Sequence, residues 1–224
     1  MPPDVHAAYA RRASEYAEHL GRMRSVHPSD VHLVTAWASC VEGPLLDAGC
    51  GPGHWTAHLA GQGVDVRGVD QVPAFIDHAR SAYPAGSFTL GSIDALDEPD
   101  DTLGGVLAWY SLIHHDPRTI RRPLDEFARV LRPGGHLLVG FFVGDALEAF
   151  DHAVVTAWRW PAEMLARELE AAGFGVIETH TRTAASGTPR SHGAIVARLR
   201  GADQAGSSSG PVSEPSDGTD ASHA

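Results

Sequence analysis

The sequence contains only two cysteines, Cys40 and Cys50, among its 224 residues. Two cysteines are too few for a disulfide framework, and no Cys-x-x-Cys spacing is present, so we expect neither a disulfide-stapled fold nor a thiolate metal site. The first residues contain no apolar signal region, and no run approaches the roughly 18 apolar residues that a transmembrane helix needs. The sequence therefore predicts a cytoplasmic protein with no metal and no membrane partner.

Basic residues are few relative to acidic ones. Lys and Arg number 17, against 28 Asp and Glu, and the net charge is −11. Because Lys and Arg contacts to phosphate dominate nucleic-acid affinity, this balance predicts no nucleic-acid partner. The only basic cluster consists of Arg118, Arg121 and Arg122, and we interpret it as the solvated face of a helix.

The chain divides into three parts by composition. Residues 201–224 contain acidic residues but no Lys or Arg, and no large apolar residue follows Val212, which predicts a disordered acidic tail. Residues 1–43 are predicted to form an N-terminal helical cap, with helices over 7–22 and from Pro28 to Gly43. Residues 44–200 are predicted to form the main domain, a length compatible with one folding unit.

Within the main domain, short apolar segments alternate with amphipathic ones. Strands are predicted at 44–49, 64–70, 87–91, 103–110, 136–144, 173–183 and 192–200. Helices are predicted at 54–63, 72–83, 117–131 and 161–173, with Pro123 as an internal interruption of the third. This order predicts an α/β fold in which helices cover both faces of a seven-stranded, mostly parallel sheet. No helix separates the last two strands, so we expect them to pair antiparallel.

The most informative segment is LLDAGCGPG, residues 45–53. A strand there leads into a tight glycine turn that opens a helix, an arrangement that places ligands at the carboxyl ends of parallel strands. Glycine allows the backbone to approach a ligand closely. The candidate ligand-binding residues are Asp47, Gly49, Cys50, Gly51 and Gly53. We interpret Cys50 as a small residue of the turn.

The spacing of this turn bears on which ligand it binds. A dinucleotide fingerprint places its third glycine where His54 stands. Asp47 would also lie close to a pyrophosphate, whereas a cofactor with an ammonium and a sulfonium group would favour that carboxylate. S-adenosylmethionine has both groups and no phosphate. Asp70, 17 residues beyond Gly53, is placed to bind ribose hydroxyls of either cofactor.

The segment LLDAGCGPG, with VDQ downstream, resembles the class I S-adenosylmethionine-dependent methyltransferases, in particular the small, single-domain bacterial type. Further segments of that family are resembled, in the order of the chain, by AYARRASEY near the N-terminus and by GSIDAL, LAWYSLIHH and LDEFARVLRPGGHLLVGFF after the glycine turn. The resemblance implies a Rossmann-like sheet whose last strand is antiparallel, and S-adenosyl-L-methionine as the cofactor. It implies further cofactor-binding roles for Tyr9, Tyr16, Gln71, Ser92, Ile93, Asp94, Trp109, Tyr110 and Ser111.

The family's reaction is a direct displacement in which the protein mainly aligns the reactants. A general base is needed only for an acceptor that is protonated until attack. His114, which follows the fourth strand, is the candidate base, and no catalytic triad is evident. The aromatic-rich stretch 141–160 is a candidate either to line a pocket for a small-molecule acceptor or to cover the sheet edge.

Two other functions stay open. A non-catalytic module that binds S-adenosylmethionine would have the same motifs, because the family's chemistry needs no signature base. A nicotinamide-dependent oxidoreductase shares the sheet, but Asp47 and the absence of glycine at position 54 argue against it. Oxygen, nitrogen, carbon and sulfur acceptors are all compatible with the sequence, which predicts no oligomeric state.

Overall fold

The computed structural model describes residues 22–151, 156–183 and 191–201. The predicted helix over 7–22 and the predicted acidic tail lie almost wholly outside these residues. Nine strands are described: β1 Leu45–Ala48, β2 Val66–Asp70, β3 Ser87–Leu90, β4 Leu103–Trp109, β5 Leu131–Val143, β6 Glu148–Asp151, β7 Thr156–Trp160, β8 Phe174–Arg182 and β9 Ser191–Leu199. The helices are α2 Pro28–Ser39, α3 His54–Ala60, α4 Pro73–Ala82, α5 Arg121–Val130 and α6 Ala162–Ala171, preceded by the 3-10 turn η1 Met23–Ser25.

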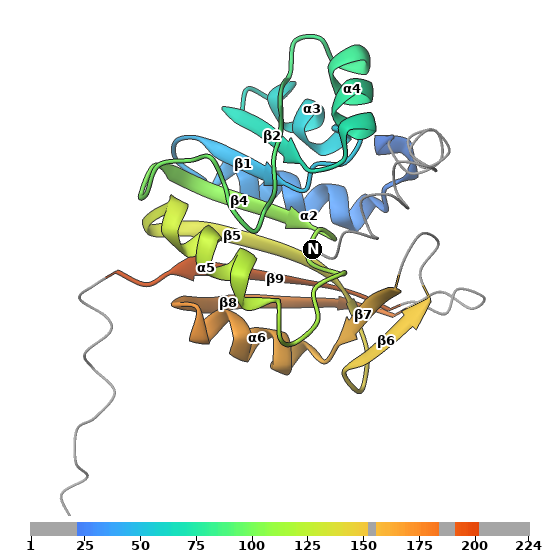
Figure 1. The fold of residues 1–224 in the computed structure, drawn as a ribbon, viewed down its shortest axis with the longest axis vertical. Coiled ribbons are helices and arrows are strands. Elements are labelled where there is room, and N and C mark those ends of the chain that lie inside the picture. The colour runs from blue at the N-terminus through green and yellow to red at the C-terminus, as the bar shows by residue number, and fades with distance from the viewer. Residues whose placement is uncertain (1–21, 152–155, 184–190, 202–224) are drawn as a thin grey trace, which may run out of the picture.

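The seven predicted strands form one sheet in the order β3-β2-β1-β4-β5-β9-β8 (Figure 1). The first five are parallel, and β9 runs antiparallel to both β5 and β8. The predicted fold, including its antiparallel last strand, is confirmed. The direction of winding reverses between β1 and β4, and ligands of such sheets bind at the carboxyl ends of the strands beside this reversal.

Helices cover both faces of the sheet because its central strands are apolar on both sides. Successive side chains of a strand point to opposite faces. On one face, Leu45, Leu107 and Leu138 pack with Trp37 of α2 and Leu59 of α3. On the other face, Leu46, Val106, Leu137 and Val139 pack with Leu124 and Phe127 of α5 and Leu165 and Leu169 of α6. None of the described helices is both long and apolar enough to cross a membrane.

The helix α2 begins at Pro28, and the side chain of His27 caps it by accepting a hydrogen bond from the backbone N–H of Ser29. Its residues Val34 and Trp37 are buried in the same cluster as the sheet. This part of the predicted N-terminal cap therefore shares the core of the main domain. The boundary at residues 43 and 44 stays a prediction.

Two details differ from the sequence analysis. First, the stretch 141–160 contains a hairpin, in which β6 and β7 pair antiparallel and β7 also pairs with the end of β5. Second, α5 begins at Arg121, not at residue 117, because the Asp116 side chain accepts the backbone N–H groups of Arg118 and Thr119 and forms a turn there. Pro123 therefore lies in the first helical turn, where a missing N–H removes no hydrogen bond, and the prediction that it interrupts the helix is wrong.

Candidate functional site

The glycine turn after β1 has a backbone conformation and close contacts that favour residues without side chains. Gly49, Gly51 and Gly53 have φ values of 79°, 53° and 86°, a region that favours glycine. A Cβ on Gly49 would lie 2.3 Å from Cβ of Ser111, and one on Gly53 would lie 2.7 Å from the ring of Phe88. A Cβ on Gly51 would meet no atom of the described residues within 4 Å. Among the three glycines, Gly51 is therefore the one at which the backbone leaves room for another group to approach.

Asp47 is a buried carboxyl group two residues before the turn. Its side chain is 2% exposed, and its Oδ2 accepts a 2.6 Å hydrogen bond from Oγ1 of Thr56 on α3. Burial raises the pKa of Asp47 to about 7, the hydrogen bond from Thr56 opposes this, and the nearby charge of Asp70 adds to it. A cation beside Asp47 would favour its ionised form.

Asp70, the last residue of β2, binds the backbone of two loops. Its Oδ2 accepts a 2.9 Å hydrogen bond from the N–H of Gly51, and its Oδ1 accepts one of 2.8 Å from the N–H of Val72. It thus caps the end of its strand and shapes the glycine turn. Because a carboxylate can accept about four hydrogen bonds, these contacts are compatible with the predicted ribose role. Gln71, which is half-buried, lies between Asp70 and Val72 in the sequence.

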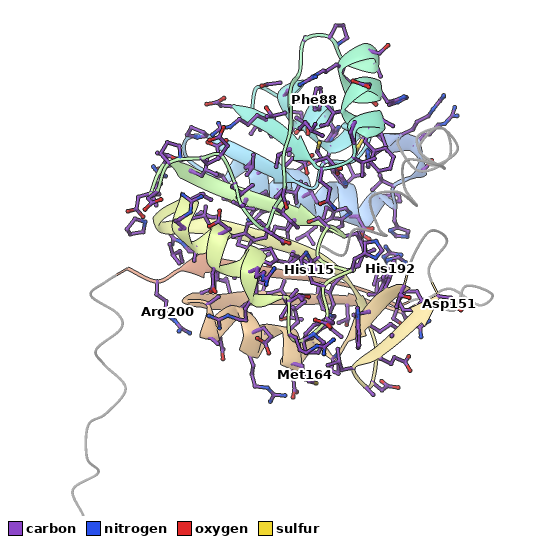
Figure 2. All side chains as sticks on the ribbon, in the orientation of Figure 1. Phe88, His115, Asp151, Met164, His192 and Arg200 are labelled. Atoms are coloured by element: carbon purple, nitrogen blue, oxygen red, sulfur yellow. The ribbon has the colours of Figure 1, made fainter. Side chains whose placement is uncertain are left out.

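The segment after β3 holds three of the residues predicted to bind the cofactor, Ser92, Ile93 and Asp94. Ile93 is buried, and the backbone N–H of Asp94 donates to Oγ of Ser92. Oδ1 of Asp94 lies 3.4 Å from Nε2 of His115, which is 0% exposed. Burial lowers the pKa of His115 to about 4, and the charge of Asp94 opposes this. His115, shown in Figure 2, is therefore a neutral core residue that connects this segment to the loop after β4.

The three residues predicted beside the cofactor at the end of β4 have different surroundings. Ser111 lies against Gly49, and its buried Oγ has no hydrogen-bond partner among the described residues. The ring of Trp109 lies 5.8 Å from that of Trp55 in an edge arrangement. The side chain of Tyr110 lines a pocket on the other side of β4, toward β9. Of the three, Ser111 is the one in contact with the glycine turn.

This pocket has a volume of about 450 Å³. It is lined by the start of α2, the end of β4, the end of β8 and the start of β9. Its polar side chains are Ser29, Asp30, Tyr110, His180, Thr181, Arg182, Thr183 and His192. Figure 2 shows His192 where β9 begins. The hydroxyl of Tyr110 lies 2.5 Å from Nδ1 of His192, and Arg182 forms a 2.8 Å ion pair with Asp30.

The aromatic residues of the predicted acceptor stretch divide between two places. Phe142 packs against Tyr110 with ring centroids 5.0 Å apart, and Phe150 packs on Phe142 at 5.4 Å. Phe142 therefore packs against a residue that lines the pocket, and Phe150 packs against Phe142. Trp160 belongs to the core on the α5 and α6 face, with Trp158 packed against it. None of the described residues of the stretch lines the pocket itself, so both interpretations of the stretch stay predictions, and His152 lies outside the described residues.

His114, the predicted base, is buried beside the β6–β7 hairpin. Its Nδ1 donates a 2.8 Å hydrogen bond to the carbonyl of Thr156, and burial lowers its pKa. It does not line the pocket. Sequence reasoning missed the pocket residues Asp30, Arg182 and His192, which come from three distant elements. The polar run of residues 178–183 at the end of β8 was the available signal.

The predicted cofactor residues Tyr9 and Tyr16 lie outside the described residues. Within the described part of the chain, no group of three or more His, Cys, Asp or Glu side chains is arranged to hold a metal ion.

Comparison with known proteins identifies the domain. Residues 45–135 match a family model described as a methyltransferase domain. The match runs from the start of β1 into β5 and contains Asp47, the glycine turn, Asp70 and Ser111. Residues 45–135 are thus similar to a methyltransferase domain, which supports the resemblance to the class I S-adenosylmethionine-dependent methyltransferases.

Several methyltransferases are similar to this chain in sequence. A malonyl-[acyl-carrier protein] O-methyltransferase of Salmonella typhimurium is 33% identical over 131 residues, which are 58% of this chain and 50% of the relative. The O-methyltransferase cnsE of Penicillium expansum is 35% identical over 153 residues, covering 60% of this chain and 52% of the relative. The chain thus spans about half the length of these relatives.

Solved structures share the fold of this chain. The crystal structure of the [4+2]-cyclase SpnF matches with a TM-score of 0.74 at 18% identity, covering 88% of this chain and 96% of that one. A Burkholderia thailandensis 1,6-didemethyltoxoflavin-N1-methyltransferase, solved with 1,6-didemethyltoxoflavin and S-adenosylhomocysteine, matches at 0.68 and 22% identity, covering 90% and 92%. These likenesses concern the fold alone.

Proposed function

We propose that this protein transfers a methyl group from S-adenosylmethionine to a small-molecule acceptor. The observation that carries the proposal is the position of Asp47, a carboxyl group buried two residues before the glycine turn. A diphosphate placed there would meet a negative charge in a poorly solvated environment, which is unfavourable. The cationic amino-acid end of S-adenosylmethionine would instead favour the ionised carboxylate.

The residues around the turn fit this cofactor. Gly51 belongs to the turn that follows Asp47, and the buried Oγ of Ser111, which has no hydrogen-bond partner among the described residues, lies beside Gly49 of that turn. In the proposal, Asp47 faces the ammonium group, Asp70 accepts from the ribose hydroxyls, and Asp94 accepts from the adenine amino group. When bound, the cofactor supplies a methyl group on a sulfonium, and an acceptor lone pair takes the methyl carbon as the carbon–sulfur electron pair returns to sulfur.

The chain's own contribution is to position an acceptor next to the turn. Tyr110, which lines the pocket, is followed in sequence by Ser111, which contacts Gly49 of the glycine turn. A volume of about 450 Å³ is typical of pockets for small ligands. The net charge of −11 argues against a nucleic-acid acceptor. The small heterocycle bound to the similar toxoflavin methyltransferase also supports a small-molecule acceptor.

Calorimetry with S-adenosylhomocysteine and with NADH tests the cofactor assignment. We expect S-adenosylhomocysteine to bind at one site per chain and NADH not to bind. Binding of NADH alone would overturn the proposal in favour of an oxidoreductase.

A second assay tests catalysis with radiolabelled S-adenosylmethionine and a panel of phenols, amines and thiols. Transfer of label to one class of acceptor is expected. Binding of S-adenosylhomocysteine without transfer to any member of the panel would favour the non-catalytic binding module.

A further inference from the structure

Tyr110 and His192 form a hydrogen-bonded pair on the wall of the pocket. The Tyr110 hydroxyl lies 2.5 Å from Nδ1 of His192, and both residues line the cavity. The ring of Phe142 lies 5.0 Å from that of Tyr110 and 5.8 Å from that of His192, so it packs against both members. Burial raises the pKa of Tyr110, with the charge of Asp30 adding to the effect and Arg182 opposing it. The phenol therefore keeps its proton at neutral pH and donates it to Nδ1 of His192 in the tautomer that leaves this nitrogen unprotonated.

The backbone at Tyr110 places this pair close to the cofactor turn. Tyr110 has a φ of 58°, a left-handed conformation that is unfavourable for a residue with a Cβ and that occurs preferentially at functional sites. Its N–H donates to the carbonyl of Gly140. The next residue, Ser111, has its Cβ against Gly49. This reversal directs Ser111 to the glycine turn and Tyr110 to the pocket.

Other polar groups of the pocket already form pairs of their own. Asp30 of α2 and Arg182 of β8 form an ion pair, and His180 of β8 forms one with Glu178 at 2.9 Å. These are the charged and titratable side chains that surround the Tyr110–His192 pair from α2 and β8, while β5 presents the ring of Phe142. The Tyr110–His192 pair joins two groups that can relay a proton.

On the basis of the proposed function, we propose that the pocket binds an acceptor with a phenolic or enolic hydroxyl, and that Tyr110 and His192 remove its proton. The acceptor hydroxyl gives its proton to the oxygen of Tyr110, while the phenolic proton of Tyr110 passes to Nδ1 of His192. The acceptor oxygen keeps the electron pair of its O–H bond, which is the pair used in attack. His192 becomes an imidazolium ion, and Tyr110 ends as a neutral phenol.

Among oxygen acceptors, acidity favours this class. A carboxylic acid titrates near pH 4 and is ionised without a base, so a proton relay would serve no purpose. A phenol such as tyrosine titrates near pH 10 and imidazole near pH 6.5, a gap of about 3.5 units that a positioned base can bridge. An aliphatic alcohol, with an acidity near that of water, is too weak an acid for imidazole. Two aromatic residues, Trp109 and Tyr110, line the pocket and offer apolar contacts to the ring of a phenol.

The test uses 4-nitrophenol, whose ionised form absorbs visible light, as a probe of the pocket. Its ionisation is titrated by absorbance on the protein loaded with S-adenosylhomocysteine, and again without that ligand. In the wild type, bound 4-nitrophenol should ionise at lower pH than in free solution. His192→Gln and Tyr110→Phe should each raise the pH of ionisation by about one unit or more, equivalent to a tenfold loss of proton-accepting power.

His78→Gln is the control, because His78 lies on α4 and does not line the pocket. This variant should titrate like the wild type. Failure of 4-nitrophenol to bind, or wild-type titration in both pair variants, would overturn the inference. Calorimetry with S-adenosylhomocysteine on each variant reports folding and the cofactor site separately. If the wild type does not bind S-adenosylhomocysteine, the proposed function is wrong. In that case the titration of 4-nitrophenol without S-adenosylhomocysteine still tests the role of Tyr110 and His192.

Discussion

Thr56 donates a 2.6 Å hydrogen bond to the buried carboxyl group of Asp47. The contact joins the first turn of α3 to β1 across the glycine turn that separates them. It also stabilises the ionised form of a carboxyl group whose pKa burial raises to about 7. The charge on which we base cofactor recognition is therefore set by a balance between burial and this single hydroxyl group.

Cofactor affinity should depend on pH through Asp47. Because the pKa of Asp47 is about 7, the carboxyl group is largely protonated at pH 6 and largely ionised at pH 8. We expect the affinity for S-adenosylhomocysteine, measured by calorimetry, to rise by up to about tenfold per pH unit below pH 7 and to level off above it. Asp47→Asn should bind weakly and show no such rise. A wild-type affinity that is constant from pH 6 to 8 would contradict the electrostatic role.

Asp47 should also lower the stability of the ligand-free protein at high pH. Between pH 4 and 7 the unfolded chain has lost the Asp47 proton while the folded protein retains it, so the free energy of unfolding falls as pH rises. The rise of the Asp47 pKa from 3.8 to about 7 corresponds to a loss of unfolding free energy of at most on the order of 4 kcal/mol. Chemical denaturation at pH 5 and pH 8 should show a smaller loss for Asp47→Asn than for the wild type. Asp77→Asn, at an exposed position of α4, is the control and should behave as the wild type.

His115 should make the fold sensitive to acid. Its pKa is about 4 in the folded protein, below the ordinary 6.5, so between these values the unfolded chain binds a proton that the folded protein does not. Stability contributed by the neutral imidazole is lost as pH falls below 6.5, by on the order of 3 kcal/mol. The difference in unfolding free energy between pH 7 and pH 5 should be smaller in His115→Gln. An unchanged difference would mean that His115 is protonated in the folded state.

The glycine turn offers a matched pair of substitutions. Gly49→Ala and Gly51→Ala both place a Cβ at positive φ, which costs about 1–2 kcal/mol. Only at Gly49 does the new Cβ overlap a neighbour, Cβ of Ser111, adding about 1–3 kcal/mol. Thermal unfolding should therefore show a larger loss for Gly49→Ala. Equal losses would mean that the contact with Ser111 relaxes at no cost.

The steric part of that prediction can be separated from the conformational part. In the double variant Gly49→Ala with Ser111→Gly, the overlapping Cβ is removed, so the stability should recover to about that of Gly51→Ala.

Asp70→Ala should weaken binding of S-adenosylhomocysteine about tenfold or more, because the proposed ribose contacts lose a charged partner. The same change leaves the N–H groups of Gly51 and Val72 without their acceptor, so the melting temperature should fall as well. Asp70→Asn retains one oxygen acceptor and should lose less of both. Calorimetric affinity that is unchanged in Asp70→Ala would refute the ribose role.

The strands and helices could be predicted from the sequence where burial leaves a clear local pattern of apolar residues. The glycine turn, the run 103–110 and the segment 192–200 predicted β1 with its turn, β4 and β9, because burial on one or both faces of a strand leaves a visible apolar pattern. The hairpin of β6 and β7 was missed because its strands bury few side chains: β6 has no buried residue, and β7 has two. It is held by contacts to the end of β5 and by a hydrogen bond from Trp158 to the carbonyl of Ile113, neither of which is local in sequence.

By itself, the sequence determined the alternation of strands and helices, the carboxyl group two residues before the glycine turn, and the resemblance to the methyltransferase family. All three depend on residues close together in the chain. The tertiary structure decided that Tyr110 meets His192, 82 residues away, and that Arg182 meets Asp30, 152 residues away. Those meetings require the antiparallel register of β9 on β5 and the left-handed backbone at Tyr110, which no local pattern of residues encodes.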